Sequence, residues 1–333
     1  MDSAGASPSP SSVGELRLFR TAWRDAADCP TWPAFFQTVL DAGWAGVEAP
    51  APESPAESDA FFAALEASKL AWIAEVSTCT APGLFVPIPG RSWRQHLASL
   101  EEGVRRSLQG RDAGCAPEFV NTMAGADYFS ASDALSFHAS VLELEAKLGL
   151  PISVETHRGR YTYSPWLTRD LLLALPTLRI TADVSHWVNV SERLVLDDEP
   201  ELLSLLSDHV YHVQPRVGYS CGPQVPDPRA PEWADELKAH ERWWDVMFDA
   251  VEARGQRRPT ATPEFGPGHY LQATPFTRTP AADLWEVNRW IGERQRARRA
   301  RLAGGGGRGG AGTPRAEGGT RRAAMSARCC RCC

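Results

Sequence analysis

Residue types that bind metals gather at the ends of four consecutive apolar segments in the second half of the chain. They are Glu155 and His157, Asp183 and His186, His212, and Glu264. Carboxylates at the end of an apolar strand are costly to bury unless a cation compensates their charge. Two Glu, one Asp and one His form a mixed oxygen and nitrogen donor set. This set suits one divalent ion, such as Mn²⁺, Mg²⁺, Co²⁺ or Zn²⁺, without selecting among them.

Structural roles compete with the metal-binding interpretation for each of these residues. A single Glu or Asp at a strand end is also typical of a helix cap or an ion pair. His186 follows Asp183 by three positions, so it could contact the metal, the substrate or the next helix. The same choice is open for His157, whereas His269 falls in a loop and is expected outside the ligand set. The coincidence of one such residue on each of four consecutive strands favours a common site.

Short β-like segments alternate with helical segments along most of the chain. The predicted strands are 16–23, 45–50, 71–78, 119–125, 152–159, 178–185, 211–218 and 260–267. The predicted helices are 32–42, 55–69, 92–108, 130–148, 165–176, 199–208, 231–254 and 280–299. Eight such pairs predict a single closed (β/α)8 TIM barrel, in which catalytic groups lie at the C-terminal ends of the strands. A doubly wound sheet is disfavoured because no GxGxxG motif follows the first strand.

Composition bounds the remaining choices. The chain has a net charge of −6, and residues 294–333 alone carry eleven Arg and one acid, so the rest is strongly acidic. An acidic body argues against a nucleic-acid partner. The sequence shows no 18-residue apolar stretch and no secretory signal. Its scattered cysteines are typical of reduced thiols. We therefore expect a cytoplasmic protein without a membrane partner. An organellar transit peptide and a homo-oligomer are left open.

The ends of the chain differ in composition from its middle. Residues 1–14 are rich in Ser, Pro and Gly, and residues 301–333 are rich in Gly, Arg and Cys, ending in "CCRCC". Such segments bury too little apolar surface to order themselves, so we expect two disordered tails around a barrel spanning 15–300.

Four stretches resemble the metal-binding strand ends of the xylose isomerase-like TIM-barrel superfamily. They are "VETHRGR", "ADVSHW", the strand that opens with His212, and "TPEFGPGHY". This superfamily includes ketose epimerases, hydroxypyruvate isomerase, inosose dehydratase and endonuclease IV, and the resemblance covers about residues 16–293. It implies that Glu155, Asp183, His212 and Glu264 hold one divalent ion. It also implies that His186 and Arg216 contact substrate, although Arg216 follows His212 more closely than in the epimerases.

The chemistry that this set supports is proton transfer next to a carbonyl. A divalent ion that binds a carbonyl and a neighbouring hydroxyl stabilises an enediolate, and Glu155 and Glu264 could exchange its proton as acid and base. We therefore expect an isomerase or epimerase of a sugar or small keto-polyol. His157 and Trp187 are further candidates for substrate contacts. Trp23, Glu48 and Glu75 are candidates for either substrate or structural roles.

Other functions remain as alternatives. A metal-dependent dehydratase would share the first proton transfer and differ in the bond that breaks next. An endonuclease IV-like repair enzyme would need further histidine ligands, whereas strands 2 and 3 read "GVEAP" and "IAEVST". A barrel that only binds a ligand would bind no metal. The Pro- and Gly-rich loop 218–233 could be a lid over the site or a simple connection to the next helix.

Overall fold

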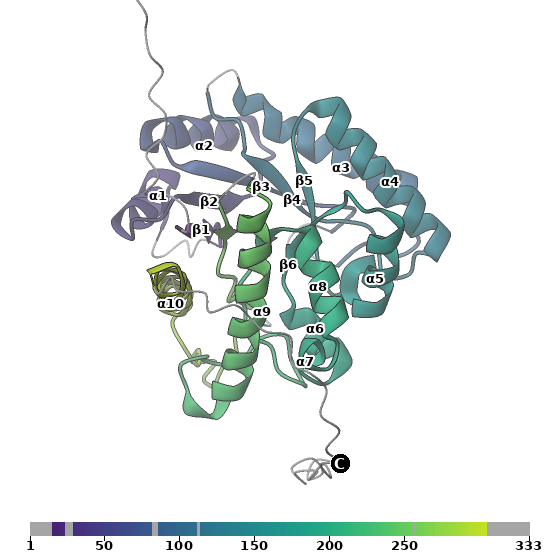
Figure 1. Cartoon of the computed structure of the whole chain (residues 1–333). Helices are drawn as coiled ribbons and strands as arrows, with labels where there is room; N and C mark the ends of the chain where they lie inside the picture. The colour runs from purple at the N-terminus through teal and green to yellow at the C-terminus, as the bar shows by residue number, and fades with distance from the viewer. Residues whose placement is uncertain are drawn as a thin grey trace, which may run out of the picture.

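Eight parallel strands close into a barrel in the order β1 to β8, and helices surround it (Figure 1). This computed structural model describes residues 15–23, 29–81, 86–111, 114–255, 258–268 and 270–304, so the predicted N-terminal tail and residues 305–333 of the predicted C-terminal tail lie outside the described residues. The strands are β1 (Arg17–Thr21), β2 (Gly46–Ala49), β3 (Ala71–Ser77), β4 (Phe119–Met123), β5 (Ile152–Glu155), β6 (Arg179–Ala182), β7 (Val210–Val213) and β8 (Thr260–Ala261). The predicted (β/α)8 barrel is confirmed.

Each strand is followed by at least one helix. The helices are α1 (Trp32–Asp41), α2 (Pro55–Ser68), α3 (Trp93–Ser107), α4 (Ala131–Leu148), α5 (Pro165–Ala174), α6 (Ser185–Ser191), α7 (Val195–Asp198), α8 (Pro200–His209), α9 (Ala234–Ala253) and α10 (Leu284–Gly304). Three short 3-10 turns, η2 (Leu108–Arg111), η3 (Tyr161–Tyr163) and η4 (Pro231–Trp233), complete the connections. None of the helices in the described part of the chain is long and apolar enough to cross a membrane.

Helix α5 shows how local sequence sets an element. Ser164 precedes it in extended conformation and accepts a hydrogen bond from the backbone nitrogen of Leu167, and Pro165 occupies the first helical position. Both features are favoured where the first backbone N–H groups of a helix lack partners. Leu171 and Leu172 are buried against the barrel. The helix ends at Ala174, two residues before the predicted end at Pro176.

The interior of the barrel changes character along its axis. Phe19, Ile73 and Phe119 form a separate apolar cluster near the strand N-termini. Toward the C-terminal ends, the buried interior side chains are mostly polar or charged, as in Glu155 and Asp183. The apolar half fixes the strands together, and the polar half provides a rigid frame for side chains that would be costly to bury singly.

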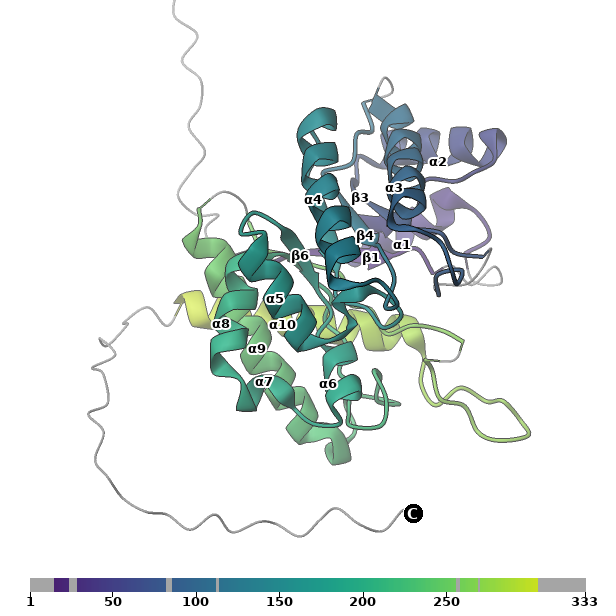
Figure 2. The ribbon, with the colours of Figure 1, turned by 90° about the vertical axis from the view of Figure 1, so that its right-hand side faces the viewer.

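Helix α10 is an ordered part of the barrel and extends four residues past the predicted domain end. Its arginines form ion pairs with acids on α9: Arg294 with Glu241 at 2.7 Å and Arg298 with Asp245 at 2.6 Å. Figure 2 shows α10 running across the molecule beside α9. The first arginines of the basic segment 294–333 are therefore neutralised within the fold.

Candidate metal centre and active site

Three carboxylates from three strands meet at the C-terminal end of the barrel. Glu155 is the last residue of β5, Asp183 directly follows β6, and Glu264 follows β8 by three residues. One oxygen from each lies within 4.8 Å of the others, and all three residues are buried. The convergence follows from the topology, since parallel strands bring their C-terminal ends to one mouth. The structure thus brings together three of the four predicted ligands.

The charges of these carboxylates are poorly compensated. Burial, followed by the negative charge of Asp183, raises the pKa of Glu155 well above its ordinary value. Burial and the charges of Glu155 and Asp183 likewise raise the pKa of Glu264, even though Arg216 lies beside it. Glu155 Oε1 and Glu264 Oε2 are buried and accept no hydrogen bond among the described residues. A divalent cation fits this arrangement. It would bind the carboxylate oxygens and reduce the repulsion between the carboxylates.

Arg216, a predicted substrate contact, lies inside this cluster. Its Nη2 atom forms an ion pair with Asp183 and lies 3.3 Å from Glu264 Oε2. Its Nε donates to Ser185 Oγ at 3.2 Å. Burial alone would lower the pKa of Arg216, but the charges of Asp183 and Glu264 raise it above its ordinary value. Arg216 is therefore a fixed cation that neutralises part of the acidic cluster.

Two histidines line the same end of the barrel. The rings of His157 and His186 lie 4.2 Å apart, and with Glu155 they form a second group able to hold a metal ion. His186 Nε2 lies 3.4 Å from Asp183 Oδ2. Burial and nearby arginines lower the pKa of His157 to about 3, while burial and His157 lower the pKa of His186 well below its ordinary value. Both imidazoles are therefore neutral near pH 7.

Tyr270, which the sequence analysis missed, packs over these groups. Its hydroxyl lies 3.3 Å from His157 Nε2, and its ring lies 4.7 Å from the guanidinium of Arg216. It belongs to the segment between β8 and α10, which projects from the barrel in Figure 2. No periodic pattern marks such a residue. The only signal is its position six residues after Glu264.

The structure places His212, the fourth predicted ligand, outside the group of three carboxylates. His212 Nδ1 lies 2.8 Å from Thr260 Oγ1, and its Nε2 lies 3.0 Å from Thr262 Oγ1 and 3.3 Å from Glu48 Oε2. Its ring also packs against two phenylalanines of the apolar cluster. His212 therefore lies deeper in the barrel than the carboxylates, and its nitrogens are engaged there.

A hydrogen-bond network connects the carboxylates to the floor of the site. Asn121 Nδ2 donates to Glu48 Oε1 at 2.7 Å and to Glu155 Oε2 at 2.9 Å. Gln214 Nε2 donates to the same Glu48 oxygen at 3.2 Å. Glu48 is buried and orients the amides of Asn121 and Gln214, and its predicted contact with a substrate stays a prediction. Asn121 and Gln214 escaped the sequence analysis because amides carry no distinctive spacing.

Trp187 lies on α6 and is fully buried in the apolar core. It donates its indole N–H to the carbonyl oxygen of Thr162 at 2.9 Å. These contacts support a core role, and its predicted contact with a substrate stays a prediction.

Loop 218–233 is tied to the site from the side. Gln224 accepts a hydrogen bond from the backbone nitrogen of Gly266 at 2.7 Å and donates to its carbonyl oxygen at 3.2 Å. Val225 is buried. The loop therefore braces the segment that follows Glu264, rather than standing free as a lid.

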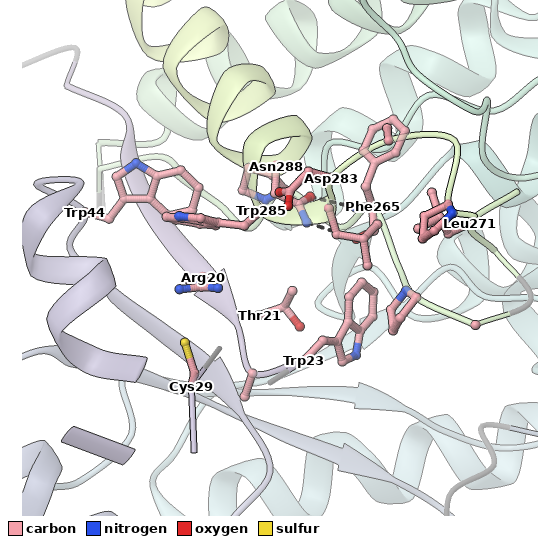
Figure 3. Close-up of a pocket in the computed structure, with 17 residues that line it drawn as sticks. Arg20, Thr21, Trp23, Cys29, Trp44, Phe265, Leu271, Asp283, Trp285 and Asn288 are labelled. Atoms are coloured by element: carbon pink, nitrogen blue, oxygen red, sulfur yellow. Dashed lines mark hydrogen bonds between the residues drawn. The ribbon is translucent and has the colours of Figure 1, made fainter. Parts of the chain in front are cut away.

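A cavity of about 990 Å³ lies beside β1 and β8 (Figure 3). Figure 3 shows Trp44 and Trp285 near Arg20 on one side and Trp23 toward the other. None of the three carboxylates lines it, although Pro263 and Phe265 do. Pro263 and Phe265 flank Glu264 in the chain, so this segment contributes to both the cavity and the carboxylate centre. Trp23 belongs to the cavity.

Comparison of the fold finds solved structures that are similar over most of the chain. A 3-keto-D-glucoside 4-epimerase from E. coli matches with a TM-score of 0.52 and 14% identity over 85% of this chain and 100% of that chain. A xylose isomerase domain containing protein from Salmonella typhimurium matches with a TM-score of 0.51 and 15% identity, over 87% and 98% of the two chains. A xylose isomerase-like TIM barrel protein from Mycobacterium smegmatis, solved in complex with magnesium, matches with a TM-score of 0.52 and 10% identity, over 85% and 95%.

The sequence matches no protein-family model and no curated protein. At identities this low, the structural likeness speaks for architecture alone. The closed eight-stranded barrel of this chain agrees with it. The chain has a TIM-barrel fold similar to that of these proteins.

Proposed function

We propose that this chain is a divalent-metal-dependent isomerase or epimerase that acts on a sugar or small keto-polyol. The observation that carries the proposal is the meeting of Glu155, Asp183 and Glu264 at the barrel mouth, with two of their oxygens lacking hydrogen bonds. Charged groups buried in this way, with strongly shifted pKa values, are typical of catalytic sites. The proposed cofactor is one divalent ion.

The acid and base of the reaction would be Glu155 and Glu264. When bound, a divalent ion polarises a substrate carbonyl and acidifies the neighbouring C–H bond. A carboxylate whose pKa is raised above its ordinary value is better suited to take up and return that proton. Glu155 and Glu264 both have raised pKa values and come from β5 and the β8 end. One would remove the proton and the other would return it.

The remaining side chains would hold the substrate. Asp183 is fixed by Ser185, whose backbone nitrogen and hydroxyl donate to Asp183 Oδ1 at 3.1 Å and 2.6 Å. Arg216 offers a permanent cation for developing negative charge on oxygen. The neutral imidazoles of His157 and His186 add no charge, and their hydrogen bonds to Tyr270, Arg158 and Arg216 position these side chains around the site. A polyhydroxylated carbonyl compound matches this lining better than an apolar substrate does.

The proposal is tested by removing metal from the purified full-length protein and restoring Mg²⁺, Mn²⁺, Co²⁺ or Zn²⁺ in turn. Each form is incubated with a panel of ketoses and keto acids, and the products are separated and identified. We expect conversion of at least one ketose to an isomer or epimer, only with metal. Loss of water from the substrate would instead assign a dehydratase. Absence of any turnover together with absence of metal binding would overturn the proposal in favour of a binding barrel.

A further inference from the structure

The position on β7 that faces the carboxylates is occupied by a glutamine. On the β6 side, His212 pairs with Thr181, so Gln214 stands opposite Asp183, and its backbone nitrogen donates to the carbonyl oxygen of Ala182 at 3.0 Å. Side chains of a strand alternate, so His212, Gln214 and Arg216 all point into the barrel at successive levels. Gln214 is the one level with Asp183.

The pairing with β8 gives the same order. Val213 pairs with Ala261, which places Gln214 opposite Thr262, and the backbone nitrogen of Glu264 donates to the carbonyl oxygen of Pro215 at 3.2 Å. Arg216 therefore stands opposite Glu264. The strands of a closed barrel are staggered. Inward-pointing side chains at one height of the barrel can therefore come from positions that differ by two residues in the pairing of neighbouring strands. The carboxylate cluster thus meets β7 between Gln214 and Arg216, above His212.

The amide of Gln214 is oriented with a free oxygen. Its Nε2 donates to Glu48 Oε1, an oxygen that also accepts from Asn121. The nitrogen must therefore face Glu48, and the carbonyl oxygen faces away from it. Gln214 Oε1 is buried and has no hydrogen-bond partner among the described residues. A buried amide oxygen without a partner is uncommon and calls for a ligand.

The buried side-chain atoms around the cluster that lack a hydrogen bond among the described residues are all oxygens. They are Gln214 Oε1, Glu155 Oε1, Glu264 Oε2, Asn121 Oδ1 and Glu48 Oε2. Of these, Glu264 Oε2 has an ion-pair contact with Arg216 at 3.3 Å, and the register of β7 places Gln214 level with Asp183. The imidazole nitrogens, by contrast, are engaged. His212 contacts two threonine hydroxyls, His157 contacts Tyr270 and the carbonyl oxygen of Arg158, and His186 contacts Arg158 and Arg216.

We infer that Gln214, and not His212, completes the metal centre, which is then an all-oxygen site formed with Glu155, Asp183 and Glu264. Carboxylate and amide oxygens are the donors of hard cations, whereas an imidazole favours Zn²⁺ and Co²⁺. The centre therefore selects Mg²⁺ or Mn²⁺ over Zn²⁺. This inference rests on the proposed metal dependence and deepens it by naming the class of ion and the fourth ligand.

The direct test uses Mn²⁺ bound to the full-length wild-type protein. Electron spin echo envelope modulation detects nitrogen nuclei coordinated to Mn²⁺. We expect no imidazole coupling in the wild type and a clear coupling in Gln214→His, which serves as the positive control. An imidazole coupling in the wild type would overturn the inference. This readout needs no turnover, and the wild-type measurement holds even if a variant fails to fold.

Affinities provide the second test. Free Mn²⁺ is measured by its electron paramagnetic resonance signal, with Mg²⁺ and Zn²⁺ as competitors. Gln214→His should shift the preference toward Zn²⁺ by about tenfold or more, and Gln214→Leu should weaken Mn²⁺ binding by a similar factor. His212→Gln is the matched control on the same strand and should leave Mn²⁺ affinity nearly unchanged.

The outcomes separate this inference from the proposed function. Unchanged affinities in both Gln214 variants, or loss of Mn²⁺ binding in His212→Gln, would overturn the role of Gln214 while metal dependence stands. Failure of the wild type to bind any of the three ions would overturn the metal-dependent function itself.

Discussion

Arg216 and Asp183 form an ion pair inside the barrel, and neither side chain is more than 1% exposed to solvent. A buried pair of this kind is weak evidence for stability as a whole, yet breaking it is costly because one charge is left alone. Among the described residues, Arg216 is also the one cation that directly contacts two of the three carboxylates. This pair therefore links the stability of the metal-free protein to the organisation of the site.

Replacing Arg216 tests that link. We expect Arg216→Met to lower the free energy of unfolding of the metal-free protein by about 3–5 kcal/mol, because Asp183 loses its counter-charge. Added Mn²⁺ should restore more stability in this variant than in the wild type. Urea unfolding with and without Mn²⁺ measures both effects. The control is Arg193→Met, which breaks an exposed pair with Asp198 and should change stability by less than about 1 kcal/mol. An Arg216 variant as stable as the wild type would contradict this account.

Neutralising either catalytic carboxylate should have opposite effects on activity and stability. Glu155→Gln and Glu264→Gln should each reduce kcat by roughly 10²–10⁴, because the proton carrier is lost. In the metal-free protein both should raise the melting temperature, because one of three mutually repelling carboxylates is removed. The control is Glu118→Gln. It breaks the ion pair of Glu118 with Arg17 at the opposite end of the barrel and shows the effect of removing a carboxylate outside the site. Full turnover in either site variant would refute the acid and base assignment.

Glu75 predicts a specific dependence of stability on pH. Burial, followed by the negative charge of Glu48, raises the pKa of Glu75 to about 8, from an ordinary value of 4.5. Between these values the folded protein keeps a proton that the unfolded chain has released, so stability falls as pH rises from about 5 to 8. Part of the side chain is exposed, so the slope stays below the one-proton limit of about 1.4 kcal/mol per pH unit.

The variant Glu75→Gln should remove this contribution. We expect it to be more stable than the wild type at pH 8 and nearly equal to it at pH 5, as measured by urea unfolding at both values in chelator. A variant with the same difference at both pH values would show that Glu75 does not titrate in this range.

Trp187 offers a test of its role as a core residue. Trp187→Phe removes the hydrogen bond to Thr162 and part of the buried ring, so we expect a loss of about 1–3 kcal/mol in stability. KM for any identified substrate should stay unchanged, because the side chain faces the packed layer outside the barrel. A raised KM with unchanged stability would restore the role that the sequence suggested.

The sequence predicted the barrel and three carboxylates because those features follow from periodicity. Apolar strands alternating with amphipathic helices leave few architectures, and strand ends in a parallel barrel share one mouth. Glu155, Asp183 and Glu264 were thus predictable from their places on the chain. The role of each in catalysis stays a prediction.

The fourth ligand was not predictable in the same way. In "YHVQPR" both His212 and Gln214 point inward, and residue chemistry favours the histidine. Only the register of β7 against β6 and β8 shows which one is level with Asp183. Tyr270 was missed because it reaches the site from a loop, and the direction of Trp187 was set by the start of α6. These features depend on long-range packing that a local pattern does not contain.

The central claim, metal-assisted proton transfer by this site, is tested most directly by hydrogen exchange. The ketose panel is incubated in D₂O with the full-length protein, and loss of the proton next to the carbonyl is followed by NMR. We predict deuterium incorporation into at least one ketose with Mg²⁺ or Mn²⁺, none in chelator, and loss of exchange in whichever of Glu155→Gln and Glu264→Gln lacks the proton-removing carboxylate. Exchange that persists at full rate in chelator or in both variants would contradict the account.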